Sequence, residues 1–188
     1  MRFLTIGDSC TDVFIYGKCE RICPEAPVPV FSPVKEHRNG GMARNVQANV
    51  IALGVDCDVL THTNEILKTR YVDIKTNQML LRVDEDDKAE NKFSPKGIEW
   101  SVYDAVLISN YCKGFVSMSD VRDICAYHNN VYLDSNKCEI KMDLPLNLRY
   151  LKINEQELEI NPFLKHHLVV DPGHESGYTR PSQIIVTR

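Results

Sequence analysis

Short apolar runs and stretches of helical periodicity alternate along most of the chain. The apolar runs predict buried strands at residues 2–6, 104–109, 131–134, 149–153 and 184–186. Residues 43–53 are apolar at helical spacing and stop at Gly54, and residues 118–128 predict a second helix. Apolar strands separated by helices are typical of βαβ units, so the sequence predicts an α/β fold with a mainly parallel sheet flanked by helices.

Other segments predict strands outside that sheet. Residues 13–16 and 28–31 are short strand patterns interrupted by Gly17 and by Pro24, Pro27 and Pro29. Three prolines cannot all donate in a central ladder, so this part should be an edge strand or a projecting lid.

A hairpin would complete the expected lid. Residues 69–74 and 78–83 predict two strands of this hairpin, joined across residues 75–77. Residues 58–60, which precede it, predict a separate strand. The acidic run at residues 84–90 predicts a solvated loop or a helix start. We therefore expect a single domain, residues 1–188, with lid segments at about 13–34 and 69–84.

Composition narrows the class of partner. A chain of 188 residues is long enough for one core, and 43% hydrophobic with 26% charged residues is typical of globular proteins. The net charge of −4 disfavours a nonspecific nucleic-acid binder, which normally has a basic face, so we expect a small-molecule partner and no nucleic acid.

The N-terminus and the cysteines indicate a location. The first apolar run is too short for a membrane span or a secretory signal, which predicts a cytoplasmic protein without membrane contact. Seven cysteines without close CxxC pairs predict reduced thiols. Cys19, Cys23 and His37 are conceivable zinc ligands, but no second matched pair accompanies them, so no metal site is predicted there.

Chemistry-bearing residues gather near the N-terminus in a fixed order. Gly7-Asp8-Ser-Cys-Thr-Asp12 follows the first strand, Pro24-Glu-Ala-Pro-Val-Pro-Val30 comes next, and Gly40-Gly-Met-Ala-Arg-Asn45 opens the first helix. Glycines at a helix N-terminus let a ligand approach the backbone, and carboxylate and amide groups bind hydroxyls. On residue type alone, Asp8 and Asp12 could equally cap turns and Asn45 could face solvent.

The combined order resembles the sugar site of the ribokinase-like (PfkB) carbohydrate kinases and, within them, the heptose 7-phosphate kinases. This resemblance implies a three-layer ribokinase-like fold with a small β lid. It also implies that Asp12, Gly40, Gly41 and Asn45 hold sugar hydroxyls.

Two further stretches agree with the heptose kinases. Lys68-Thr-Arg-Tyr71 and Asn77-Gln-Met-Leu-Leu-Arg-Val-Asp84 resemble paired strands near the substrate, which implies that Arg82 binds phosphate; the alternative is a surface strand residue. Ser109-Asn-Tyr-Cys-Lys-Gly114 resembles an Asp-Tyr-x-Lys-Gly stretch with Asn110 in place of aspartate. Lys113 would then contact substrate, although a loop lysine is more often solvated.

The resemblance also implies a nucleotide and magnesium region, and hence ATP and Mg²⁺ as cofactors. Asn154-Glu-Gln-Glu157 matches the Asn-x-x-Glu motif that organises magnesium and phosphate without direct ligation, and an ordinary helix start explains it equally well. Asp134-Ser-Asn-Lys137 resembles an Asp-Pro-Lys-Gly turn in which Lys137 is displaced by one position.

These 188 residues also depart from the family pattern. Few residues connect His62 to Lys68, and no Gly-Ala-Gly-Asp segment follows Gln183-Ile-Ile-Val-Thr-Arg188, so no catalytic base aspartate is present. We expect an incomplete C-terminal part, with the ATP site affected, and little or no kinase activity from this polypeptide alone.

Three interpretations follow. The first is ATP-dependent phosphoryl transfer to a sugar phosphate such as heptose 7-phosphate, with the missing part supplied from elsewhere. The second is a catalytically inactive sugar-binding or homologue-binding remnant, and the third is a shortened product whose fold persists without a ligand. The resemblance also implies a homodimer formed through the lid strands, because exposed strand edges are usually covered.

Overall fold

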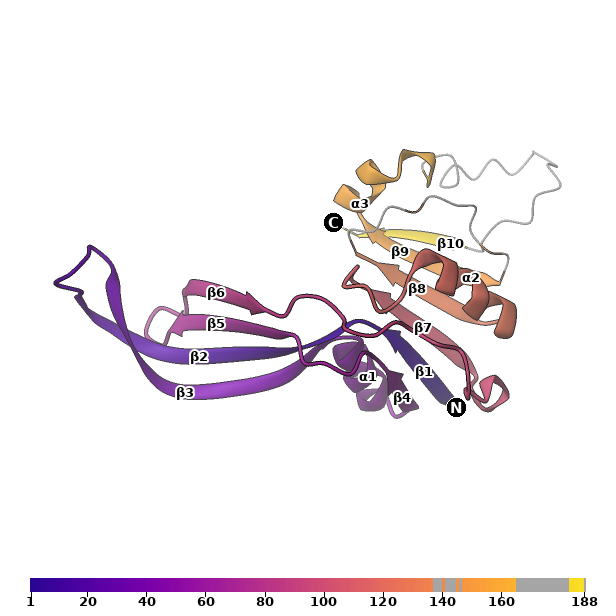
Figure 1. The fold of residues 1–188 in the computed structure, drawn as a ribbon, viewed down its shortest axis with the longest axis horizontal. Helices are drawn as coiled ribbons and strands as arrows, with labels where there is room; N and C mark the ends of the chain where they lie inside the picture. Colours follow the sequence, from indigo (N-terminus) through magenta and orange to yellow (C-terminus); the bar gives the residue numbers. More distant parts are fainter. Residues whose placement is uncertain (137–139, 141–144, 146, 165–182, 188) are drawn as a thin grey trace.

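A six-stranded parallel sheet forms the body of the protein (Figure 1). The computed structural model describes residues 1–188 except 137–139, 141–144, 146, 165–182 and 188. Within this described part the strand order is β10-β9-β8-β7-β1-β4, and each neighbouring pair is parallel. The strands are β1 (Arg2–Gly7), β4 (Asp56–Leu60), β7 (Ala105–Asn110), β8 (Val131–Ser135), β9 (Leu148–Asn154) and β10 (Gln183–Thr187).

Helices cover both faces of this sheet. On one face, α2 (Met118–Tyr127) packs Val121 and Ile124 into a core that includes Ile6, Ile108 and Leu133. On the other face lies α1 (Ala43–Ala52), whose Gln47 donates to the Cys57 carbonyl of β4 at 2.8 Å. Figure 1 shows α2 in front of the sheet and α1 behind it. The predicted α/β class, with a parallel sheet flanked by helices, is therefore confirmed.

Local sequence signals determine the helix ends. Ser117 and Asp120 form a capping box at the start of α2, and Gly54 follows α1 with a φ of 81°, a conformation that favours glycine. Three further short elements are α3 (Glu155–Ile160), which follows β9, and the 3₁₀ turns η1 (Trp100–Val102) and η2 (Pro162–Leu164).

Four strands form a second sheet, which we call the projecting sheet, with the order β3-β2-β5-β6. They are β2 (Ser9–Ile22), β3 (Pro29–Met42), β5 (Leu67–Asp73) and β6 (Met79–Glu85). The β2–β3 and β5–β6 pairs are antiparallel, whereas β2 and β5 run parallel. Figure 1 shows this sheet extending away from the main sheet.

The projecting sheet corrects one sequence prediction and confirms two. The strands predicted at 13–16 and 28–31 are parts of two 14-residue strands, so Gly17 does not end β2. Instead the register shifts between Tyr16 and Gly17, and a Cβ at Gly17 would collide with the Phe31 ring. The proline-containing β3 is an edge strand, and β5 and β6 form the predicted hairpin.

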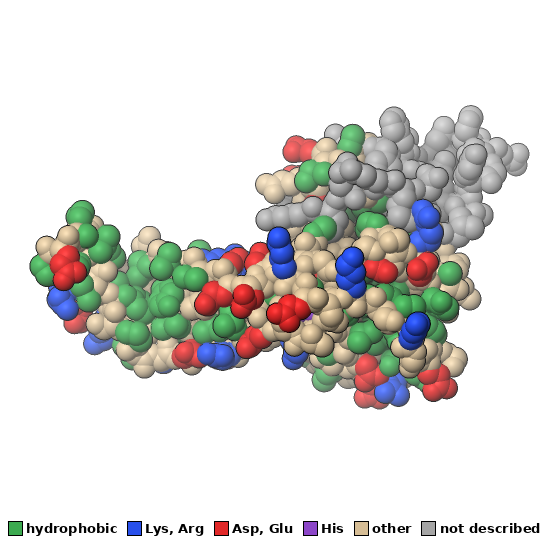
Figure 2. Space-filling view, viewed as in Figure 1, with side chains coloured by type: hydrophobic (Ala, Val, Ile, Leu, Met, Phe, Trp, Pro, Cys, Tyr) green, Lys and Arg blue, Asp and Glu red, His purple; other side chains and the backbone are tan. Residues whose placement is uncertain are grey.

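Apolar side chains remain exposed on the projecting sheet. Figure 2 shows hydrophobic side chains gathered along this part of the molecule. They include Leu81 at 56%, Val34 at 55% and Met79 at 54% exposure. One apolar hollow on this sheet is lined by Cys19, Val28, Pro29, Phe31, Pro33, Tyr71, Leu80 and Leu81.

The cysteines depart in one place from the predicted reduced state. Cys10, Cys19, Cys23, Cys57 and Cys125 are free, but Cys112 is disulfide-bonded. In the described residues, no helix has the length and apolarity needed to cross a bilayer.

Candidate functional site

A cavity of about 530 Å³ lies where the projecting sheet meets the carboxyl ends of the main strands. The chain leaves β1 toward β4 on one side, whereas β7 lies on the other side of β1. Ligands of open α/β sheets bind at such a switch point. The cavity is lined by Cys10, Asp12, Asn39, Gly41, Met42, Asn45, Lys68, Arg70, Arg82, Asp84, Asp87, Tyr111, Lys113 and Asn136.

Asp8 holds the loop after β7 against the end of β1. This fully buried carboxylate accepts backbone N–H bonds from Tyr111 at 2.8 Å, Lys113 at 3.1 Å and Phe115 at 3.2 Å. Gly7 permits the close approach, because a Cβ there would collide with the Ser109 carbonyl. Asp8 therefore positions Tyr111 and Lys113 at the cavity without lining it.

A second polar anchor fixes the connection to the projecting sheet. His62 is buried between the Ser9 carbonyl, at 2.9 Å from Nε2, and the Asn64 carbonyl, at 2.8 Å from Nδ1. Asn64 in turn donates to the Lys88 carbonyl at 2.9 Å. These contacts hold the segment before β5 and the segment after β6 together beneath the cavity.

Strand register assembles a polar row across the projecting sheet. Asp12 of β2 lies opposite Asn39 of β3 and opposite Lys68 of β5, and Lys68 lies opposite Asp84 of β6. Directly opposed residues point to the same face of a sheet. One face of four strands thus presents an amide, two carboxylates and an ammonium group to the cavity.

Two residues farther along, Arg70 and Arg82 form a second row. They lie directly opposite each other on β5 and β6, and both line the cavity. Arg70 donates to Asp12 at 2.6 Å and lies over the Phe14 ring, 5.0 Å from its centroid. Arg82 makes a bidentate contact with Asp84, at 2.7 and 2.9 Å.

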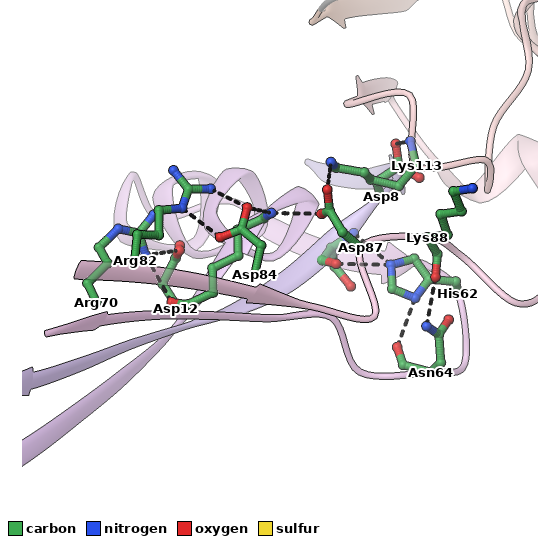
Figure 3. A network of polar contacts seen from close by, with 12 residues as sticks. Asp8, Asp12, His62, Asn64, Arg70, Arg82, Asp84, Asp87, Lys88 and Lys113 are labelled. Carbon is green, nitrogen blue, oxygen red and sulfur yellow. Dashed lines mark hydrogen bonds and ion pairs between the residues drawn. The ribbon is translucent and has the colours of Figure 1, made fainter.

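Two lysines complete the network (Figure 3). Lys68, whose side chain is only 6% exposed, contacts Asp84 at 3.1 Å and Asp87 at 2.8 Å, and Lys113 also pairs with Asp87. Four cations and three carboxylates therefore line the cavity, a net positive charge in a chain whose net charge is −4.

The pKa shifts follow from these contacts. The hydrogen bond from Arg82 lowers the pKa of Asp84 to about 2, with Lys68 adding to the effect. Desolvation opposes the charged form of Lys68, but hydrogen bonds to Asp87 and Asp84 prevail and raise its pKa. Burial, with Asp12 nearby, raises the pKa of Cys10 to about 11, which keeps this cavity thiol protonated.

Gly41 brings the β3–α1 junction against Asp12. A Cβ at Gly41 would collide with Asp12 Oδ2 and the Cys10 sulfur. The next residue, Met42, has a φ of 55° and turns the chain into α1, which exposes Asn45 on the first turn. The junction between β3 and α1, at Gly41 and Met42, thereby forms one wall of the cavity.

The structure brings together most of the sugar-site residues predicted from sequence. Asp12, Gly41, Asn45, Arg82 and Lys113 all line the cavity. Gly40 lies one residue outside the lining, where a Cβ would collide with the Arg44 side chain.

The predicted nucleotide region lies apart from the cavity. Asn154 and Glu157 cap α3 reciprocally, with Glu157 N donating to Asn154 Oδ1 at 2.9 Å and Asn154 N to Glu157 Oε2 at 2.7 Å. Lys137 lies outside the described residues. No cluster of three or more His, Cys, Asp or Glu side chains in the described part of the chain is placed to hold a metal ion.

Sequence reasoning missed several cavity residues: Asn39, Lys68, Arg70, Asp84, Asp87, Tyr111 and Asn136. Residues 86–90 form a loop as predicted, but Asp84 lies within β6, and Asp87 of the loop pairs with two lysines. The two-residue alternation of Lys68 with Arg70 and of Arg82 with Asp84 was the available signal, because it places all four on one face of a hairpin.

Sequence comparison finds relatives among characterised proteins, although no family model matches the chain. The bifunctional protein HldE of Helicobacter acinonychis is 31% identical over 165 residues, covering 70% of this chain and 36% of that protein. The HldE of Helicobacter pylori strain J99 is 32% identical over 162 residues, covering 68% and 35%. The chain thus spans about a third of the length of these curated relatives.

Solved structures share the fold at low identity. A carbohydrate kinase from Agrobacterium tumefaciens gives a TM-score of 0.52 at 13% identity, over 85% of this chain and 62% of that one. A pyrophosphate-dependent kinase in the ribokinase family gives 0.50 at 11% identity, over 98% and 72%. The relatives and the fold confirm the resemblance that the motifs indicated: the chain is similar in sequence to HldE and has the fold of ribokinase-like carbohydrate kinases.

Proposed function

We propose that the cavity is the acceptor site of a carbohydrate kinase and that it binds a sugar phosphate such as heptose 7-phosphate. The observation that carries this proposal is the polar row of the projecting sheet, in which Asp12 lies beside Asn39 and within reach of Gly41. The motif resemblance to heptose 7-phosphate kinases and the similarity to HldE favour the heptose.

The lining groups suit a polyhydroxylated ligand with a charged end. A carboxylate accepts hydrogen bonds from hydroxyls, whereas the amides of Asn39 and Asn45 both donate and accept. The four cations of the cavity suit a phosphate group. The four cations outnumber the three carboxylates of the cavity, and this excess favours an anionic over a neutral sugar.

ATP and Mg²⁺ enter the proposal through the family resemblance. The chemistry that ATP supplies is the phosphoryl group that a sugar hydroxyl accepts. Asn154 Oδ1 and Glu157 Oε2 are engaged in the α3 cap, so they do not fit as direct metal ligands, and we assign no step to the metal. The cavity residues would bind and orient the sugar.

Calorimetric titration of the 188-residue chain with heptose 7-phosphate and, separately, with magnesium ATP tests this function. We expect the sugar phosphate to bind to the unchanged chain and to lose affinity for Asp12→Ala. Asp56→Ala is the control, because it alters an exposed residue of β4 outside the cavity and should leave the affinity unchanged. No heat with the sugar phosphate would contradict the proposal. A parallel assay of phosphoryl transfer separates an active kinase from an inactive sugar-binding protein.

We also propose that two copies pair through the apolar face of the projecting sheet. The exposed Leu81, Val28 and Leu80 surround a hollow that includes Tyr71, and a second copy would cover them. We expect the chain to elute as a dimer in gel filtration at micromolar concentration and Leu81→Asp to elute as a monomer. A monomeric unchanged chain would contradict this pairing.

A further inference from the structure

Arg70 and Arg82 stand directly opposite each other on adjacent strands. Like charges in that position repel, so an isolated hairpin would disfavour the pair. Here each guanidinium has one carboxylate partner, Asp12 for Arg70 and Asp84 for Arg82. The repulsion between the two arginines is therefore offset by these carboxylates, and an incoming anion could take their place as the partner of each guanidinium.

Both guanidiniums keep donors directed to the cavity. Arg70 uses Nη1 for Asp12 and for the Lys68 carbonyl, whereas Arg82 uses Nε and Nη2 for Asp84. In the described part of the chain the remaining N–H groups of the two side chains make no hydrogen bond. A guanidinium has five N–H donors in a planar fork that matches phosphate geometry.

Asp12 is the residue most affected by this pairing. It is the carboxylate at the centre of the polar row, yet its Oδ1 is held by Arg70 at 2.6 Å and its side chain is only 18% exposed. A sugar hydroxyl that binds Oδ1 of Asp12 must compete with a charge-assisted hydrogen bond, which is stronger than a neutral one.

We propose that Arg70 and Arg82 together bind the phosphate group of the sugar phosphate, and that this binding releases Asp12 from Arg70 so that its carboxylate can bind the sugar hydroxyls. This inference rests on the proposed function. It predicts that the site recognises the phosphate and the sugar cooperatively, and so discriminates against the same sugar without phosphate.

Calorimetry with heptose 7-phosphate and unphosphorylated heptose tests the inference. The unchanged chain should bind the phosphorylated form at least ~10-fold more tightly, as expected when two charge-assisted contacts are added. Arg82→Met should lower that ratio by weakening only the phosphorylated sugar, since Arg70 alone remains to bind the phosphate. Arg82→Lys should fall between, because an ammonium keeps the charge but loses the fork.

Arg70→Met gives the distinguishing result. Without Arg70, Asp12 is free in the absence of phosphate, so this variant should bind unphosphorylated heptose more tightly than the unchanged chain while binding heptose 7-phosphate less tightly. If its affinity for unphosphorylated heptose is unchanged or lower, the release of Asp12 is wrong. Arg70→Lys serves as the second variant if removal of the contact with Phe14 prevents folding.

Arg38→Met is the matched control. Arg38 also lies on the projecting sheet and pairs with an acidic residue two positions away, Glu36 at 2.5 Å, but it does not line the cavity. It should leave both affinities unchanged. Equal binding of the two sugars by the unchanged chain would overturn this inference alone, whereas binding of neither sugar would overturn the proposed function together with it.

Discussion

The two sheets of this protein use their side chains in opposite ways. The main sheet buries apolar residues under α2 and presents little of its centre to solvent, with Val106, Val131 and Leu133 at most 1% exposed. The projecting sheet presents one polar face to the cavity and leaves apolar residues such as Leu81 exposed. Stability therefore resides in the main sheet, and the proposed ligand recognition resides mainly in the projecting sheet.

The largest expected effect tests that division directly. Leu133→Ala should lower the free energy of unfolding by about 2–5 kcal/mol, because it opens a space in a close-packed core. The same change at Leu81, which is 56% exposed, should cost no more than about 0.5 kcal/mol in the monomer. Urea denaturation of both variants at low protein concentration checks the contrast, and equal losses would contradict it.

A smaller effect should separate binding from stability. Gly41→Ala should weaken sugar phosphate binding by ~10-fold or more, about 1.4 kcal/mol, because the new Cβ displaces Asp12. Gly54→Ala is the matched control. Its φ of 81° makes alanine unfavourable by about 1–2 kcal/mol in stability, yet it lies outside the cavity and should not affect binding. Calorimetry and thermal unfolding of both variants decide whether the two effects separate.

The smallest effect is a dependence on pH. The folded-state pKa of Asp84 is about 2, below its ordinary value of 3.8, so the Arg82 and Lys68 contacts stabilise the fold above pH ~4. That contribution should be lost as the pH falls from ~4 to ~2. Asp84→Asn should therefore be less stable than the unchanged chain at pH 6, with the difference shrinking at pH 2–3. Asp56→Asn controls for the loss of one carboxylate, and a difference that persists undiminished at pH 2 would contradict the account.

Sequence periodicity predicted the main sheet well because its central strands, such as β7, are largely buried on both faces. Residues 104–109 and 131–134 match β7 and β8 closely, and α1 ends at Ala52, just before the predicted stop at Gly54. The projecting sheet was harder to predict. Its strands β2 and β3 are long, polar in places and interrupted by glycine and proline, so local pattern identified only their apolar segments.

The site was predicted where a motif marked it and missed where only register creates it. Asp12, Gly41 and Asn45 belong to contiguous motifs. Arg70 and Lys68 reach the cavity because β5 pairs with β2 across the intervening β3, α1 and β4, a contact that no local pattern contains. Asp87 lies in an acidic run that looks solvated until Lys68 and Lys113 are placed beside it.

A crystal structure of the chain with heptose 7-phosphate tests the central claim most directly. We predict that the sugar hydroxyls contact Asp12 and Asn45, that the phosphate lies between Arg70 and Arg82, and that Arg70 no longer contacts Asp12. A sugar phosphate bound outside this cavity, or bound within it with the Arg70–Asp12 contact intact and the phosphate away from both arginines, would contradict the account.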